Sequence, residues 1–235
     1  MAPLPRRLLA ELLGSAFLAA LVVGSGIAAQ RLSPGDTGLQ LLENATATAG
    51  GLVALILAFG PVSGAHLNPV VSLADALFGG LDTRDLAVYV GAQVTGAIGG
   101  SIVANLMFDL HAVTWSTNER SSGGLWLSEV VATIGLLVVI FGVVRSGRSS
   151  AAPFAVGAYI GAAYFFTSST SFANPAVTIG RAFTDTFAGI EPPSVPAFVA
   201  CQLVGGALAV LLVRALYPDI ATVADEVVVP HVEEP

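Results

Sequence analysis

Long apolar stretches separated by short polar segments dominate the chain. Such stretches predict membrane-spanning helices, because about 20 apolar residues in helical form cross the hydrocarbon core of a bilayer and a helix satisfies its own backbone polar groups. Two further apolar segments, 69–79 and 175–187, are too short to span, and each begins with Asn-Pro, so we predict that they form half-helices. The six spanning helices are predicted at about 8–29, 45–62, 86–108, 126–144, 152–168 and 194–217.

Each short segment opens with a helix-start signal. The Asn-Pro pairs stand at 68–69 and 174–175; Asn caps the first free backbone N–H groups, and Pro fits the first helical turn. Two helix N-termini inside a membrane would aim partial positive charge at whatever passes between them, which admits neutral solutes and rejects cations. A single Asn-Pro pair is usually only a structural cap, and the duplication is what favours a pore role.

The order of features repeats along the chain. Glu11 and Glu129 each open a span, an Asn-Pro pair follows the next span, and a Gln at 93 or 202 lies in the third. The partners lie 118, 106 and 109 residues apart, which indicates an internal duplication. Three spans per copy is an odd number, so the second copy is inverted and the half-helices enter from opposite faces. We predict a single membrane domain over residues 1–235, with inverted repeats at about 8–108 and 126–217.

Composition supports a membrane protein. The chain is 54% hydrophobic and 11% charged, against about 25% charged residues in soluble domains. The net charge of −7 argues against a nucleic-acid partner, which requires a basic stripe. The acidic segment 218–235 is expected to be a disordered, solvated tail. We expect the lipid bilayer as the partner and no cofactor. His66, His111 and His231 lack metal-ligand spacing, so no metal site is expected.

Arginine placement predicts the orientation. A short apolar run behind Arg6 and Arg7 also resembles a cleaved signal peptide, but about 18 apolar residues follow Glu11, which is enough to span. With the N-terminus inside, six arginines fall in cytoplasmic segments and two outside, so we expect both termini on the cytoplasmic side of the plasma membrane. The inside set is Arg6, Arg7, Arg84, Arg145, Arg148 and Arg214, and the outside set is Arg31 and Arg120.

At these positions the chain resembles the aquaporin, or major intrinsic protein, family over roughly residues 8–217. Two Asn-Pro boxes at equivalent places are specific. The second box, Asn174-Pro175-Ala176, is the family's usual tripeptide, and the first, Asn68-Pro69-Val70, keeps an apolar side chain behind the cap. The resemblance implies an all-α fold of six transmembrane helices and two re-entrant half-helices, and a homotetramer with one pore per subunit. It also implies passive conduction of small neutral solutes, with Asn68 and Asn174 donating hydrogen bonds into the pore.

The outer constriction departs from the family pattern. Most members have Arg directly after the second box, and this chain has Val177. Counted without gaps from each Asn, the other three constriction positions fall on Thr48, Ala162 and Ser171. All four residues are small and uncharged, so we expect a wide opening with few charge-assisted donors and passage of solutes larger than water.

Arg181 has two interpretations. It lies one helical turn after Val177, so it could reach the outer mouth as a displaced donor, or it could pair with Asp185 or with loop carbonyls. The segment from Val177 to Phe187 is similar to a bacterial aquaglyceroporin-like subgroup associated with arsenic resistance. This resemblance adds neutral arsenous acid, a compact polyol-like molecule, to glycerol-like candidates.

Other polar residues leave alternatives open. Glu11 and Glu129 either couple to protons or accept hydrogen bonds from the re-entrant loops, and their symmetry favours the second role. His66 either lines and gates the vestibule or braces its loop. The competing functions are a strict water channel, a proton-coupled carrier that uses Glu11 or Glu129, and a membrane-junction protein with a closed pore. The chain shows no nucleophile elbow, phosphate loop or catalytic carboxylate pair, so we expect no enzyme activity.

Overall fold

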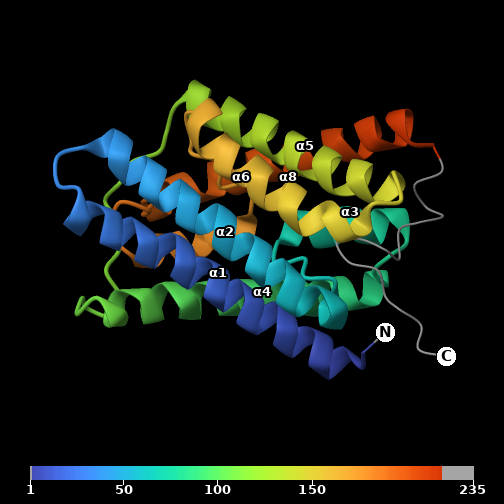
Figure 1. Cartoon of the computed structure of the whole chain (residues 1–235), viewed down its shortest axis with the longest axis horizontal. Helices are drawn as coiled ribbons and strands as arrows, with labels where there is room; N and C mark the ends of the chain where they lie inside the picture. Colours follow the sequence, from blue (N-terminus) through green and yellow to red (C-terminus); the bar gives the residue numbers. More distant parts are fainter. Residues whose placement is uncertain (1, 219–235) are drawn as a thin grey trace.

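Helices and loops make up the computed structural model, which describes residues 2–218 (Figure 1). The predicted acidic tail 218–235 therefore lies almost entirely outside the described residues. The all-α prediction is confirmed. The long helices are α1 (Leu4–Leu32), α2 (Thr37–Ser63), α4 (Thr83–Met107), α5 (Gly123–Arg145), α6 (Ala152–Phe166) and α8 (Val195–Leu216), and the short ones are α3 (Pro69–Phe78) and α7 (Pro175–Gly180).

Five helical segments in the described chain are long and apolar enough to cross a membrane: α1, α2, α4, α5 and the segment Pro192–Leu216 that contains α8. The sixth predicted span corresponds to α6, which has 15 residues and is about 22 Å long at 1.5 Å per residue. It ends at Phe166 because Thr167 adopts extended backbone, with φ −111° and ψ 138°.

Capping residues explain where the helices begin. The side chain of Asp36 accepts a hydrogen bond from the Leu39 N–H, so α2 starts eight residues before the predicted position 45. The prediction followed the apolar run and missed a polar first third of the helix. In that part, Gln40 donates to the Ser33 carbonyl at 2.8 Å and Asn44 donates to the Val22 carbonyl at 3.0 Å.

The second half-helix is shorter than predicted. The chain forms α7 and one 3₁₀ turn, Arg181–Phe183, and leaves helical geometry at Thr184. The prediction of helix to residue 187 is therefore wrong. The Thr184 hydroxyl donates to Asn105 Oδ1 at 2.7 Å, and this tertiary bond turns the following loop back toward Arg181. Local apolar composition does not report such a contact.

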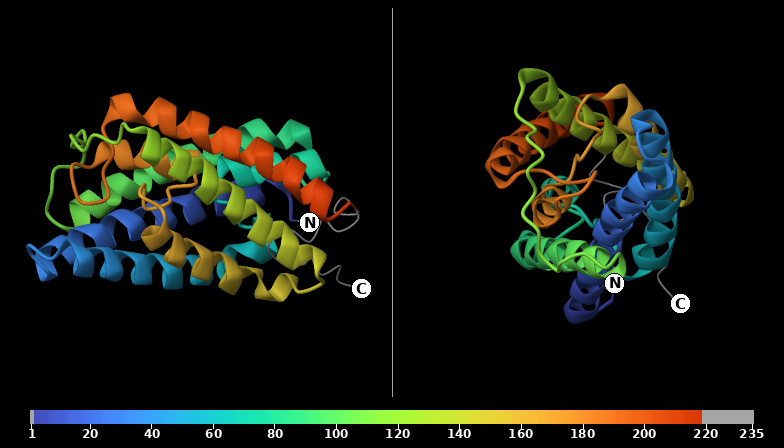
Figure 2. Two further views of the ribbon diagram at one scale, coloured as in Figure 1. Left: turned by 90° about the horizontal axis from the view of Figure 1, so that it is seen from above. Right: turned by 90° about the vertical axis from the view of Figure 1, so that its left-hand side faces the viewer.

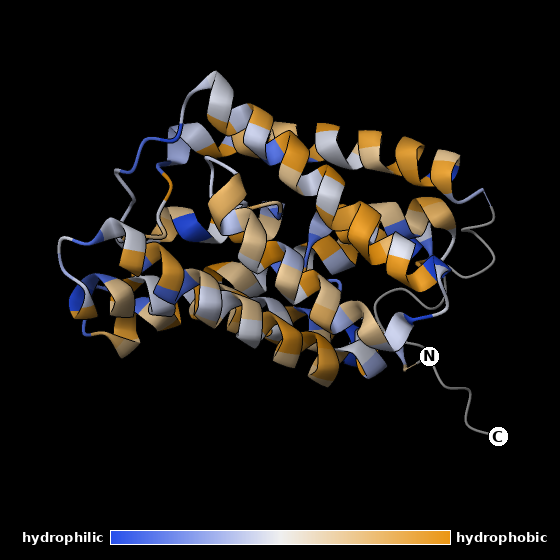
Figure 3. Cartoon of the chain, turned by 45° about the horizontal axis from the view of Figure 1, so that its top comes forward, coloured by the Kyte–Doolittle hydropathy of each residue, from blue (hydrophilic) through white to orange (hydrophobic). Residues whose placement is uncertain are grey.

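The long helices surround the two half-helices, as the end-on view in Figure 2 shows. We call the end that holds residue 2 and the 79–82 loop the amino-terminal end. The opposite end, which holds the 33–36 and 108–122 loops, is the far end. Half-helix α3 lies in the amino-terminal half and α7 in the far half. Apolar residues predominate along the long helices (Figure 3), and many large apolar side chains are exposed, among them Leu9, Phe17 and Phe154, as expected for a surface that faces lipid.

Glycines let helices touch backbone to backbone. A Cβ added at Gly96 would lie 2.2 Å from the Leu12 carbonyl oxygen, and one at Gly100 would lie 2.0 Å from the Ala16 carbonyl oxygen. Helix α4 can therefore pack directly on α1. On the other side of the bundle, Gly205 of α8 stands in the same way against the Val130 carbonyl of α5. Small residues at such contacts are the usual means of close packing between membrane helices.

The variant Gly100→Ala is expected to destabilise the fold by roughly 1–3 kcal/mol, because the added methyl group meets rigid backbone. A fall in the midpoint of thermal unfolding in detergent would report it. The control is Gly99→Ala, one residue away on the same helix, where a Cβ meets nothing within 4 Å. The control is expected to be neutral or slightly stabilised, since Ala favours helix over Gly. Equal effects of the two variants would contradict the packing argument.

Candidate solute pathway

The two loops that precede the Asn-Pro pairs share one unusual backbone shape. Ala65 and Leu67 have φ of 47° and 49°, and Ser171 and Ala173, 106 residues later, have 51° and 45°. L-residues with side chains rarely adopt positive φ, and each such residue costs on the order of 1–3 kcal/mol unless the surroundings hold it. Both loops therefore need strong local anchoring.

Glu11 anchors the first loop. One carboxylate oxygen accepts from the Ser63 hydroxyl at 2.6 Å and from the His66 N–H at 3.0 Å. The other accepts from the Leu67 N–H and from Gln93 Nε2, both at 2.7 Å. The side chain is fully buried, so these four bonds replace the water that an isolated carboxylate would require.

Glu129 anchors the second loop in the same manner. Its oxygens accept from the Phe172 and Ala173 N–H groups, each at 2.9 Å, and from Gln202 Nε2 at 2.6 Å. Ser169 completes the match, because its hydroxyl accepts from the Ser171 N–H as that of Ser63 does from the Ala65 N–H. Both carboxylates are thus occupied by the scaffold, and this favours the structural role over proton coupling.

The two Asn caps meet tip to tip. Asn68 Oδ1 accepts from the Val70 N–H at 3.0 Å, and Asn174 Oδ1 accepts from the Ala176 and Val177 N–H groups at 3.0 and 3.2 Å. Each amide nitrogen then crosses to the other loop: Asn68 donates to the Ala173 carbonyl and Asn174 donates to the Leu67 carbonyl, both at 2.8 Å. An amide NH₂ has two donors, so each Asn keeps one N–H for another partner. Behind the caps, four residues are buried: Pro69, Val70, Pro175 and Ala176.

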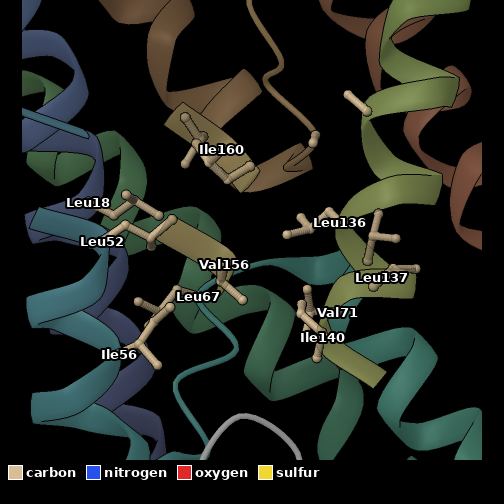
Figure 4. Packing of buried hydrophobic residues seen from close by; sticks show 14 of the residues in the cluster. Leu18, Leu52, Ile56, Leu67, Val71, Leu136, Leu137, Ile140, Val156 and Ile160 are labelled. Atoms are coloured by element: carbon tan, nitrogen blue, oxygen red, sulfur yellow. The ribbon is translucent and has the colours of Figure 1, made fainter. Parts of the chain in front are cut away.

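Both Asn side chains line one cavity of about 70 Å³. Because about 10–15 Å³ of such space holds one water molecule, the cavity is large enough for several. Aliphatic side chains from α1, α2, α5 and α6 converge on it (Figure 4). The lining residues are Leu18, Val22, Thr48, Leu52, Ile56, Ala65, His66, Leu67, Asn68, Val71, Leu136, Ile140, Val156, Ile160, Tyr164, Ser171, Phe172, Asn174, Val177 and Arg181.

One predicted constriction residue is misplaced. Thr48, Ser171 and Val177 line the cavity, but Ala162 is exposed on the outer surface of α6. Ile160 and Tyr164 line it instead. They are four residues apart and share a helix face, whereas Ala162, midway between them, points to the opposite face. The ungapped count from Asn174 does not allow for the length of the loop between α6 and the half-helix.

Two aromatic residues that the sequence pattern did not identify also line the cavity, and they make the opening narrower than predicted. The Tyr164 hydroxyl lies 3.1 Å from the Thr48 hydroxyl. The tyrosine side chain therefore fills part of the cavity that the small Thr48 side chain would leave open. Phe172 also lines the cavity. Tyr164 lies four residues after Ile160 on one face of α6, and this helical spacing could have predicted from the sequence that Tyr164 faces the cavity. Phe172 could have been found as the counterpart of His66, at the same offset of 106.

Arg181 lines the cavity and is also fixed in place. Its Nε donates to the Ala188 carbonyl, and its Cζ lies 3.3 Å from the centroid of the Phe172 ring. Asp185 is not its partner and instead accepts from the Thr117 N–H and hydroxyl at 2.9 and 3.0 Å. The Arg181 side chain therefore faces the cavity and also bonds a loop carbonyl, as two of the predicted alternatives stated, and it does not pair with Asp185.

His66 likewise both lines the cavity and braces its loop. Its Nδ1 lies 3.0 Å from the Ser72 hydroxyl, and its Nε2 lies 3.3 Å from Asp75 Oδ2. At an offset of 106, His66 corresponds to Phe172 and Asp75 corresponds to Arg181. The amino-terminal half therefore pairs a His with an acid where the far half pairs an aromatic ring with an Arg.

The variant Glu11→Gln is expected to lower stability, because its amide nitrogen would face donors in place of an acceptor. A buried N–H left without an acceptor costs roughly 1–3 kcal/mol. Thermal unfolding in detergent measures the effect, with Glu119→Gln, at an exposed residue of the 108–122 loop, as the matched control. If Glu11→Gln unfolds at the temperature of the control, the carboxylate is not the anchor of its loop.

Comparisons with known proteins agree with this architecture. A family model described as major intrinsic protein matches residues 2–173. The chain is 51% identical over 213 residues to aquaglyceroporin AqpS of Rhizobium meliloti, covering 91% of each chain. It is 30% identical to the probable aquaporin NIP4-2 of Arabidopsis thaliana, over 76% of this chain and 64% of that protein.

A solved structure has the same fold. The X-ray structure of the aquaglyceroporin from Plasmodium falciparum superposes with a TM-score of 0.73 and 22% identity, covering 94% of this chain and 100% of that chain. The six-plus-two helical arrangement predicted from the sequence is therefore confirmed. The chain is an integral membrane protein and belongs to the major intrinsic protein family.

Proposed function

We propose that the protein is a passive, bidirectional channel for water and small uncharged solutes, glycerol-like polyols among them. The observation that carries the proposal is the cross-linked pair of Asn68 and Asn174 on one narrow cavity, each with an N–H to spare. A solute oxygen can accept from both amides in turn as it moves. No chemical step and no cofactor are needed, so the proposal includes no enzyme activity.

Exclusion of cations follows from the half-helices. The N-termini of α3 and α7 approach each other, and each carries a partial positive charge. Both Asn oxygens are turned back onto backbone N–H groups, which leaves donors at the crossing point. A cation or a proton carried on water meets positive potential there, whereas a neutral hydroxyl compound is accommodated.

The far half of the cavity supports a solute class larger than water alone. Val177 is short and apolar where most of the family has Arg, and Arg181 is set one turn back, held against Phe172. On another side of the cavity, the Thr48 and Tyr164 hydroxyls supply hydrogen-bond acceptors and one donor for a solute. The name aquaglyceroporin for the relative that is 51% identical agrees with polyol passage. Arsenous acid, a compact neutral trihydroxide, fits the same requirements, and we include it among the proposed solutes.

Three further features belong to the proposal. The arginine count supports cytoplasmic N- and C-termini in the plasma membrane. The family resemblance supports a homotetramer with one pore in each subunit. The matched bonds of Glu11 and Glu129, and the matched backbone angles beside the two Asn residues, support two inverted repeats at about 8–108 and 126–217 within one membrane domain.

Glycerol flux is the direct test. In proteoliposomes followed by stopped-flow light scattering, we expect glycerol and water to equilibrate faster than in protein-free vesicles, and to do so regardless of a pH gradient or an uncoupler. Flux that depends on the pH gradient would identify a proton-coupled carrier. Water flux without glycerol, urea or arsenous acid flux would identify a strict water channel.

The variant Val177→Arg tests the constriction. A long charged side chain at this position should reduce polyol flux by roughly tenfold and water flux by less, because it removes space that only the larger solute needs. Val177→Ile is the matched control, since it adds one methylene without charge. The measurement is the ratio of glycerol to water permeability in the same proteoliposomes. Equal loss of both fluxes, or no change in the ratio, would contradict the proposed role of Val177.

A further inference from the structure

Two arginines meet at the far end of the cavity around one aromatic ring. Arg181 donates from Nε to the Ala188 carbonyl, and Arg120, from the 108–122 loop, donates from Nε to the next carbonyl, Gly189, at 2.9 Å. Their Cζ atoms lie 3.3 and 5.0 Å from the centroid of the Phe172 ring. Two residues far apart in sequence are thus fixed to consecutive carbonyl groups, with Arg181 lining the cavity and Arg120 behind it, on the Phe172 ring.

These charges are not balanced by direct ion pairs. Within residues 2–218, neither guanidinium has a carboxylate oxygen within 4.0 Å. Glu129 is the buried acid on this side, and its oxygens are occupied by backbone N–H groups and Gln202. The charges of Arg120 and Arg181 are therefore not neutralised by direct contact with any carboxylate that the structure describes. The opposite half has Asp75 at the position that corresponds to Arg181, so the two halves differ in charge at this place.

Hydrogen-bond donors remain free at the same place. Arg181 is 3% exposed and lines the cavity, and in the described part of the chain only its Nε has an acceptor. Its two terminal Nη groups are therefore available. Ser171 is 4% exposed, also lines the cavity, and its hydroxyl has no partner among the described residues. A buried donor without a partner is costly, so this corner favours a ligand rich in acceptors.

We propose that the far mouth holds a binding site for one small monocarboxylate, of the size of formate or acetate. A planar carboxylate matches the parallel N–H groups of a guanidinium, and such charge-assisted bonds are the stronger kind. In this site the two Nη groups of Arg181 bind the carboxylate, the Ser171 hydroxyl donates a further bond, and Arg120 adds long-range attraction. The carboxylate would place one negative charge beside two guanidinium groups that have no carboxylate partner among residues 2–218, and the narrow cavity of about 70 Å³ favours an acid of this small size.

A carboxylate bound at this site would obstruct the cavity. The anion would be held at the mouth by Arg181, because the aliphatic side chains that make up most of the cavity wall, Val71 and Val177 among them, disfavour a charge that leaves its guanidinium partner. It would stay at the mouth and reduce the passage of neutral solutes from that side. This consequence rests on the proposed channel function, whereas binding itself does not.

Binding is tested first, on the full chain in detergent. Saturation-transfer NMR on the single C–H proton of formate should show millimolar binding to the wild type. Arg181→Gln should weaken it by at least about tenfold, since a charge-assisted bond is lost. Arg84→Gln removes the same charge at an exposed position of the amino-terminal end and should have no effect. No binding to wild type, or equal binding to the Arg181 and Arg84 variants, overturns the proposal.

A second variant guards against misfolding of the first. Ser171→Ala reproduces the residue found at the corresponding position, Ala65, which has nearly the same backbone angle, so it should fold. It should bind formate more weakly than wild type, and unchanged binding would overturn the role of Ser171.

The second measurement is glycerol flux in the presence of sodium formate. Sodium gluconate at equal ionic strength is the control, because gluconate is too large for the cavity. Formate should slow glycerol flux at least twofold in wild type and less in Ser171→Ala. Equal effects of both salts would overturn the obstruction. Binding of formate without any glycerol flux would instead overturn the proposed function and leave the site standing.

Discussion

Two buried carboxylates hold the centre of this protein together. The loops that carry Asn68 and Asn174 must turn inside an apolar bundle, and their residues adopt left-handed backbone that L-amino acids avoid. Their N–H groups point away from any regular helix, so they need acceptors where no water is available. Glu11 and Glu129 supply these acceptors from the walls of the bundle. Without them, the strained loops that position the two half-helices would lose their main anchors.

The two halves of the chain are nearly symmetric, so the positions at which their residues differ are informative. The same framework of Glu, Gln, Ser and Asn appears in both halves, so residues that differ at corresponding places are not needed for the framework. At one such place the amino-terminal half has Asp75 beside His66, and the far half has Arg181 beside Phe172. The cavity therefore has a donor centre common to both halves, and the two halves differ in the charged residue that stands beside it. Chemistry specific to this chain is concentrated at the mouths.

Much of the fold could be predicted because its strongest constraints are local. Apolar length and Asn-Pro caps located every helix, and an odd number of spans per repeat implied inversion. The errors lie where distant contacts override local pattern. Helix α2 begins early because Asp36 caps it, and the helical geometry of the second half-helix ends at Thr184, whose hydroxyl bonds to Asn105. At the constriction, the count from Asn174 selected Ala162, although the face of α6 that meets Thr48 carries Tyr164.

The sequence by itself determined the class of the protein and the identity of its central residues. Hydrophobic length, the paired Asn residues and the paired Glu residues are properties of short segments and their spacing. The tertiary structure alone decided the chemistry of the mouths: that Tyr164 reaches Thr48, that Arg181 lies against Phe172, and that Arg120 joins them from a loop 61 residues away. The physical reason is that side-chain direction depends on helix rotation and loop path, which are set by packing between segments distant in sequence.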